Sequence, residues 1–119
     1  MKINIVGSLL SNDGYGHHTK YLANALYKVA DCKLSTQLCQ GWERLVNDAE
    51  LDMITKPERK EDWNVIIAIP HMWKMFLGTG KNACYCVFEG DKIPASWIKE
   101  MLNNKVNLIG IEISFFKLN

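Results

Sequence analysis

The sequence has 119 residues, of which 48% are hydrophobic and 23% are charged, and its net charge is +1. These values are typical of one soluble globular domain, so we expect a single domain over residues 1–119. The balanced charge gives no electrostatic reason to expect nucleic-acid binding. No apolar run is long enough to cross a bilayer or resembles a secretory signal. We therefore expect a cytoplasmic protein, with peripheral membrane association left open.

The N-terminal segment predicts a strand, a glycine loop and a helix. Residues 2–7 are mostly apolar, and Gly14 and Gly16 follow them. Apolar residues then recur with the spacing of one helical face, at Leu22, Ala25, Leu26 and Val29. A helix predicted over residues 17–29 would present free N–H groups and its positive dipole end to an anion. The glycines match neither a dinucleotide fingerprint nor a P-loop. They indicate either positive φ angles in the loop or close approach of a ligand.

The rest of the chain continues this alternation of strands and helices. Further strands are predicted at residues 33–38, 65–69, 83–88 and 106–111, helices at 42–51, 71–77 and 94–103, and a polar loop at 52–62. This order predicts an α/β fold, a Rossmann-like open and mainly parallel sheet with helices on both faces and the first strand central. Such sheets bind ligands at the carboxyl ends of their strands. Three loops are expected at that edge, over residues 8–16, 70–72 and 89–94.

Polar residues near these loops are candidates for chemistry. His17 and His18 are expected at the start of the first helix, one facing the loop and the other solvent. His71 follows a buried strand, where it could transfer a proton or donate to a substrate hydroxyl, or could simply be a rim residue. Glu89 and Asp91 flank a glycine; they suggest acid/base work or binding of sugar hydroxyls, although a solvated turn also explains them.

The four cysteines suggest no special chemistry. Cys84 and Cys86 alternate in a predicted strand and should point to one face, and no Cys/His group has zinc spacing. We expect reduced core or surface thiols, no metal site and no cofactor.

Two motifs, Asp-Gly-Tyr-Gly-His-His at residues 13–18 and the segment at residues 87–97, resemble the N-terminal half of GT-B glycosyltransferases of the family 4 type. The segment Asp-Gly-Tyr-Gly-His-His at residues 13–18, with the helix after it, resembles the first loop and helix of that family. The segment at residues 87–97, Val-Phe-Glu-Gly-Asp-Lys-Ile-Pro-Ala-Ser-Trp, resembles the family phrase aromatic-Glu-x-Asp-x-x-Pro-x-x-Trp. The resemblance implies an acceptor-side domain of a nucleotide-sugar-dependent glycosyltransferase, whose partners are a sugar acceptor and, only with a separate C-terminal domain, a nucleotide-sugar donor.

By the same resemblance, Gly14, Gly16 and His17 would bind substrate, His71 would be catalytic, and Glu89 and Asp91 would line the acceptor side. Two departures matter. The sequence has Gly110 and Ile111 where the family usually has a Pro-Ser step, and no donor domain follows in it. We therefore expect no activity from this half alone. We also expect self-association through an apolar C-terminal segment that contains Ile111, Ile113, Phe115, Phe116 and Leu118.

Two other classes of function stay open. A nucleotide-binding Rossmann module would be supported by an acidic residue after the second strand, but no carboxylate occurs there before Glu43. A non-catalytic interaction protein could keep the same fold without the chemistry.

Overall fold

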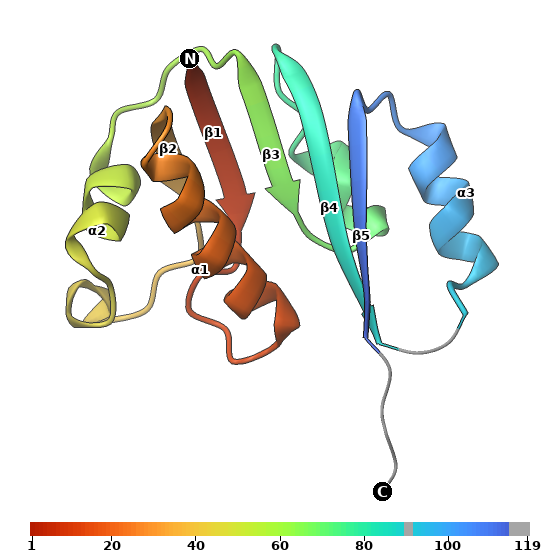
Figure 1. Ribbon diagram of the computed structural model, residues 1–119, viewed down its shortest axis with the longest axis horizontal. Coiled ribbons are helices and arrows are strands. Elements are labelled where there is room, and N and C mark those ends of the chain that lie inside the picture. The colour runs from red at the N-terminus through yellow and green to blue at the C-terminus, as the bar shows by residue number, and fades with distance from the viewer. Residues whose placement is uncertain (90–91, 115–119) are drawn as a thin grey trace, which may run out of the picture.

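Five strands pair side by side, all in parallel, in the order β2-β1-β3-β4-β5 (Figure 1). This computed structural model describes residues 1–89 and 92–114, with the side chains of Glu89, Ile113 and Ser114 outside the description. The strands are β1 (Lys2–Gly7), β2 (Asp31–Ser35), β3 (Trp63–Ile67), β4 (Lys81–Glu89) and β5 (Leu108–Ser114). The predicted Rossmann-like parallel sheet is therefore confirmed. The middle strand is β3, however, and β1 lies between β2 and β3.

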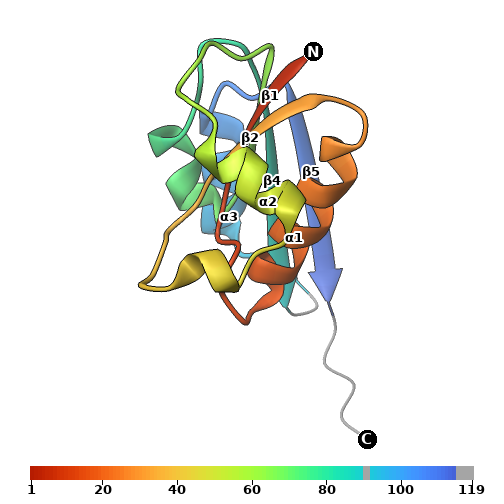
Figure 2. The same cartoon turned by 90° about the vertical axis from the view of Figure 1, so that its left-hand side faces the viewer.

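Helices lie on both faces of the sheet, as predicted. The α-helices are α1 (Gly14–Tyr27), α2 (Asp48–Thr55) and α3 (Ala95–Asn103), and the 3-10 helices are η1 (Trp42–Arg44) and η2 (Pro70–Met75). Figure 2 shows the sheet nearly edge-on, with α1 on one side and α3 on the other. We call these sides the α1 face and the α3 face. Helix α2 lies against α1 and the edge strand β2.

Each face of the sheet has its own apolar core, because side chains alternate along a strand. On the α1 face, Ile3, Ile5, Leu34 and Ile67 pack with Ala23 of α1 and Met53 of α2. On the α3 face, Ile66, Cys84 and Cys86 pack with Trp73 of η2 and Met101 of α3. The prediction that Cys84 and Cys86 share one face is confirmed. All four cysteines are free, and only Cys39 is exposed.

Several boundaries differ from the sequence prediction for local reasons. The helix expected at 42–51 is two elements, because Asn47 starts α2 with a reciprocal capping box to Glu50. Strand β2 ends at Ser35, and the next residue, Thr36, accepts a hydrogen bond from the Leu9 amide. Strand β5 begins two residues late, after Asn107 has bonded to Asn82 through both its backbone amide and its side chain.

The predicted apolar face of α1 is also only partly right. Leu22 and Leu26 pack against the core, but Val29 lies beyond the helix and is 80% exposed. The fully buried line of α1 consists of Gly16, Thr19 and Ala23. Small residues occupy this line because α1 lies close to the sheet: a β-carbon on Gly7 of β1 would lie 2.6 Å from the Thr19 hydroxyl oxygen. The small-residue line therefore sets the distance between α1 and β1.

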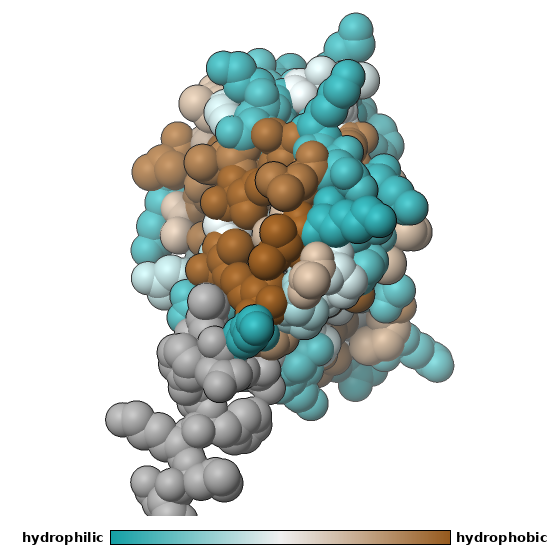
Figure 3. Space-filling view, turned by 90° about the vertical axis from the view of Figure 1, so that its right-hand side faces the viewer, coloured by the Kyte–Doolittle hydropathy of each residue, from teal (hydrophilic) through white to brown (hydrophobic). Residues whose placement is uncertain are grey.

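An apolar surface runs over the edge of the sheet at β5 and α3 (Figure 3). Its exposed members are Ile98, Leu102, Leu108, Ile109 and Ile111. Among the described residues, no helix is both long and apolar enough to cross a membrane.

Candidate functional site

The parallel sheet brings the predicted loops to one edge. Strands β1, β3 and β4 all end there, and the candidate residues of α1 and η2 follow the ends of β1 and β3. Glu89 ends β4, but its side chain and both Gly90 and Asp91 lie outside the described residues. The expected substrate-binding roles of Glu89 and Asp91 therefore stay predictions.

Gly14 and Gly16 lie inside α1 and not in a loop, since the helix begins three residues before the predicted start. Neither has a positive φ angle; among the described residues only Gly41 does. The interpretation that these glycines provide positive φ angles is therefore wrong. Gly16 is buried, and a β-carbon there would overlap the backbone carbonyl of Ser11. Tight packing of the loop explains this glycine, while its role in substrate binding stays a prediction.

The positive end of the α1 dipole already has a carboxylate. Asp13 is the N-cap residue, and its Oδ1 accepts hydrogen bonds from the Gly16 amide at 3.0 Å and from the Ser11 hydroxyl at 2.6 Å. The bonds from Ser11 and Gly16 hold the pKa of Asp13 below its usual value. The chain therefore fills with its own side chain the position where an external anion was expected.

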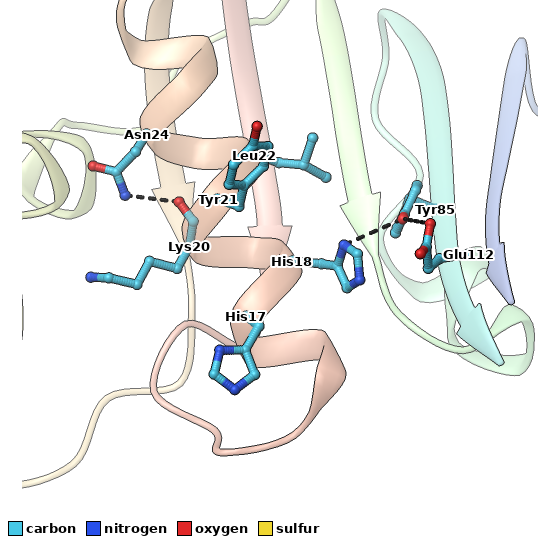
Figure 4. A pocket seen from close by; sticks show the side chains of 8 residues that line it. All are labelled: His17, His18, Lys20, Tyr21, Leu22, Asn24, Tyr85 and Glu112. Carbon is cyan, nitrogen blue, oxygen red and sulfur yellow. Dashed lines mark hydrogen bonds between the residues drawn. The ribbon is translucent and has the colours of Figure 1, made fainter. Parts of the chain in front are cut away.

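One cavity is a groove of about 770 Å³ on the α1 face, between α1 and the strands β4 and β5 (Figure 4). We call it the α1–β5 groove. Its lining combines aromatic, polar and charged side chains: His17, His18, Lys20, Tyr21, Leu22, Asn24, Tyr85 and Glu112. His17 is exposed, and His18 is half-buried. Of the residues predicted to bind substrate, His17 is the one that this groove contains.

Three side chains from different elements meet across this groove. His18 of α1 lies with Nδ1 3.3 Å from the hydroxyl of Tyr85 in β4, and that hydroxyl donates to Glu112 of β5 at 3.4 Å. The rings of His18 and Tyr85 lie 5.3 Å apart between centroids. Burial, and then the neighbouring Glu112 carboxylate, raise the pKa of Tyr85, so its hydroxyl stays protonated.

Gly110 allows this arrangement. It pairs with Tyr85 across β4 and β5, and a β-carbon there would lie 2.7 Å from the Tyr85 ring. Any larger residue would displace the ring from β5. Close packing against Tyr85, beside the groove, therefore explains why Gly110 stands where the family pattern has a Pro-Ser step.

A second cavity, of about 500 Å³, lies where the carboxyl ends of β1 and β3 meet. The chain leaves β1 toward α1 and leaves β3 toward η2, which lie on opposite faces, so this is the topological switch point of the sheet. We call it the switch-point crevice. The described residues of its lining are all uncharged. They are Val6, Gly7, Ser8, Ser35, Thr36, Gln37, Ile67, Ala68, Met72 and Phe76.

His71 lies on the opposite face of the sheet from His17. It belongs to η2 on the α3 face, and its Nδ1 is 3.7 Å from a carboxylate oxygen of Glu100 in α3. Neither of the cavities described above includes His71 in its lining. The sheet therefore separates His71 from His17 and the α1–β5 groove, and its catalytic role stays a prediction.

Tyr85 and Glu112 were not predicted as site residues. Tyr85 alternates with two cysteines in a strand, so it had to face the opposite side from them. Glu112 is the single charged residue of the apolar β5 segment, and this isolated charge could have indicated a site residue. Placing the two side by side, however, requires the register of β4 against β5.

Protein-family models, curated proteins and solved structures were compared with the chain, and none of them matches it. Among the described residues, no cluster of three His, Cys, Asp or Glu side chains could hold a metal ion. Function must therefore be argued from the residues of the two cavities.

Proposed function

We propose that this chain is the acceptor-side domain of a nucleotide-sugar-dependent glycosyltransferase and that the acceptor sugar binds in the α1–β5 groove. The composition of the groove carries the proposal. A sugar ring presents apolar C–H faces and a rim of hydroxyl groups. The groove offers the aromatic rings of Tyr21 and Tyr85 beside histidine and carboxylate groups. Apolar walls with a few convergent polar groups are what small-ligand sites require.

The fold and both motifs are consistent with this function. The sheet is parallel, and the motif at residues 13–18 caps and begins α1, the helix that forms one wall of the groove. The second motif begins at Val87 in β4, where Tyr15 joins the two motifs. The Tyr15 hydroxyl donates to the Val87 carbonyl at 2.9 Å and accepts from the Val87 amide at 3.2 Å.

The switch-point crevice supports a nucleotide-binding module as a second candidate, because open α/β sheets bind nucleotides at this place. Two observations weigh against it. The described lining of the crevice has no cation to face a phosphate. The amides at the start of α1, which often bind phosphate, are capped by Asp13. We therefore expect nucleotides to bind this chain more weakly than sugars do.

We expect no sugar transfer by the 119-residue chain alone. Transfer requires donor and acceptor in near-attack geometry, and that positioning supplies a large part of the rate. A domain that binds only the acceptor cannot provide it. Turnover of a nucleotide-sugar by the purified chain would contradict this part of the proposal.

Chemical-shift mapping tests the function. Methyl α-D-glucoside and methyl α-D-mannoside should shift the amides around His17, Tyr21 and Tyr85, and UDP and NADH should not do so. Tyr21→Ala should weaken glycoside binding by roughly tenfold, because it removes one aromatic wall of the site. Gln37→Ala, in the switch-point crevice, is the control and should leave it unchanged. Shifts at the crevice with UDP or NADH alone would instead favour the nucleotide-binding module.

A further inference from the structure

The hydrogen bonds between His18, Tyr85 and Glu112 indicate which atoms of these side chains carry a hydrogen. The Tyr85 hydroxyl has one hydrogen and lies between an imidazole nitrogen and a carboxylate oxygen. A carboxylate can only accept, so the hydroxyl donates to Glu112. The contact of 3.3 Å to His18 is then a hydrogen bond only if Nδ1 of His18 is the donor. When the imidazole is neutral, this pattern selects the tautomer of His18 that carries its hydrogen on Nδ1.

In the neutral imidazole the same pattern leaves Nε2 of His18 with a free lone pair. Within the described part of the chain, no hydrogen bond involves Nε2, and His18 is part of the groove wall (Figure 4). An imidazole fixed in this way is a hydrogen-bond acceptor whose orientation is set before a ligand arrives. Such preorganisation favours binding because less freedom is lost in the complex.

Other polar groups of the groove are already bonded to the protein. Both carboxylate oxygens of Glu50 accept from Lys20, at 3.0 and 2.8 Å. The Asn24 amide nitrogen donates to Glu50, and the Asn24 oxygen accepts from Asn47. Lys20 and Asn24 thus join α1 to α2 and are poorly placed to bind a ligand. The histidines, Glu112 and the Tyr21 hydroxyl are left to recognise one.

We propose that Nε2 of His18 accepts a hydrogen bond from a hydroxyl group of the sugar bound in the α1–β5 groove, and that Tyr85 and Glu112 are positioning residues that hold His18 in the required tautomer. This assignment rests on the proposed acceptor function. It names a residue one position from the predicted His17 and gives a reason for choosing it: His18 is half-buried and bonded, whereas His17 is exposed.

The tautomer of His18 is directly measurable by long-range ¹H–¹⁵N spectroscopy of the imidazole at a pH where it is neutral. The wild type should show the Nδ1–H form. Glu112→Ala removes the acceptor, so the Tyr85 hydroxyl can donate to Nδ1 and the Nε2–H form should become the major one. Glu112→Gln still offers a carbonyl oxygen to Tyr85 and should keep the wild-type tautomer. A purely structural role of Glu112 would not separate these two variants.

Glycoside titrations complete the test. His18→Phe and Glu112→Ala should weaken binding of methyl α-D-glucoside by roughly tenfold, about the value of one hydrogen bond. Glu112→Gln should bind as the wild type does, and so should Lys99→Ala, the control at an exposed position of α3. Equal tautomer populations in the wild type and Glu112→Ala would overturn the assignment of His18. The expected tautomer change without any glycoside shift in the groove would instead refute the acceptor function on which the assignment rests.

Discussion

The carboxylate of Glu50 in α2 lies 2.8 Å from Nζ of Lys20 in α1. The Glu50 side chain is completely buried, whereas the Lys20 side chain is 54% exposed. Glu50 also accepts from Asn24 at 2.8 Å and from the Asn47 amide at 2.9 Å. One carboxylate therefore caps its own helix and binds the helix that forms the wall of the groove.

Replacing Glu50 should destabilise the protein more than any surface substitution. Glu50→Ala removes the buried partner of Lys20 and the capping box, and we expect a loss of about 3 kcal/mol in the free energy of unfolding. Glu43→Ala, an exposed glutamate of η1, should change it by less than about 0.5 kcal/mol. Urea denaturation measures both. Equal stability of the two variants would show that the bond between α1 and α2 contributes nothing.

Stability should decrease as the pH falls into the acid range. Burial raises the pKa of Glu50, but bonds from Lys20, Asn47 and Asn24 bring it below its usual value. Hydrogen bonds from Arg59 and Lys56 lower the pKa of Asp31 from 3.8 to about 2. Carboxyls with lower pKa values in the folded state stabilise it above their unfolded pKa and lose this effect as the pH falls through the folded pKa.

The stabilisation that Asp31 contributes should therefore be lost as the pH falls from about 4 to about 2, and the urea midpoint should decrease over this range. Asp31→Asn should flatten the profile in this range, since the amide does not titrate. Asp48→Asn, an exposed position for which no bond to another side chain is described, is the matched control. A wild-type profile that stays level through this range would contradict the prediction.

Gly14 and Gly16 should respond differently to alanine. Gly16→Ala places a methyl group against the Ser11 carbonyl, so we expect a loss of about 2–3 kcal/mol in the free energy of unfolding. At Gly14 the nearest atom to an added β-carbon is Cγ1 of Val87 at 3.3 Å, and the helix propensity of alanine offsets that tight contact. Gly14→Ala should stay within about 0.5 kcal/mol of the wild type. It therefore allows a test of ligand binding at Gly14 without loss of the fold.

One thiol should react much faster than the other three. Burial raises the pKa of Cys84 to about 12 and that of Cys86 to about 11, and it also raises the pKa of Cys32. The thiolate is the reactive form, so these buried thiols should be inert in the folded protein. Cys39 is exposed. A disulfide reagent should modify one cysteine rapidly in buffer and all four in urea, and Cys39→Ser should abolish the rapid phase.

The sequence alone predicted the fold class because strand and helix signals alternate strongly. The unbroken apolar run at residues 65–69 indicated a buried parallel strand, and the Cys-Tyr-Cys alternation indicated the two faces of β4. Element ends were less well predicted, because side-chain caps set them. Asp13 caps α1, which therefore starts at Gly14, and Asn47 caps the start of a separate helix, α2.

The α1–β5 groove was harder to predict for a physical reason. His18, Tyr85 and Glu112 are brought together by the crossing of α1 over the sheet and by the register of β4 against β5, and neither leaves a local pattern. Topology also separates His71 from His17, because η2 leaves β3 on the α3 face. Both residues follow strand ends in the sequence, but the side to which each loop turns decides what they can contact.

Within the described residues β5 is an edge strand of the sheet, and this edge should cause self-association. Ile109 and Ile111 are each 40% exposed on this strand, and the apolar surface continues onto α3 through Ile98 and Leu102 (Figure 3). The side chains of Ile113, Phe115, Phe116 and Leu118, which belong to the predicted segment, lie outside the described residues.

An unpaired strand with exposed apolar side chains pairs readily with another strand, and lysine on such an edge opposes this. Sedimentation should show a mass that rises with concentration for the wild type, with association weakened by at least about tenfold in Ile111→Lys. Leu38→Lys, an exposed apolar position after β2, is the control and should associate as the wild type does. A wild type that stays monomeric at every concentration, or equal association of the two lysine variants, would contradict an interface at β5.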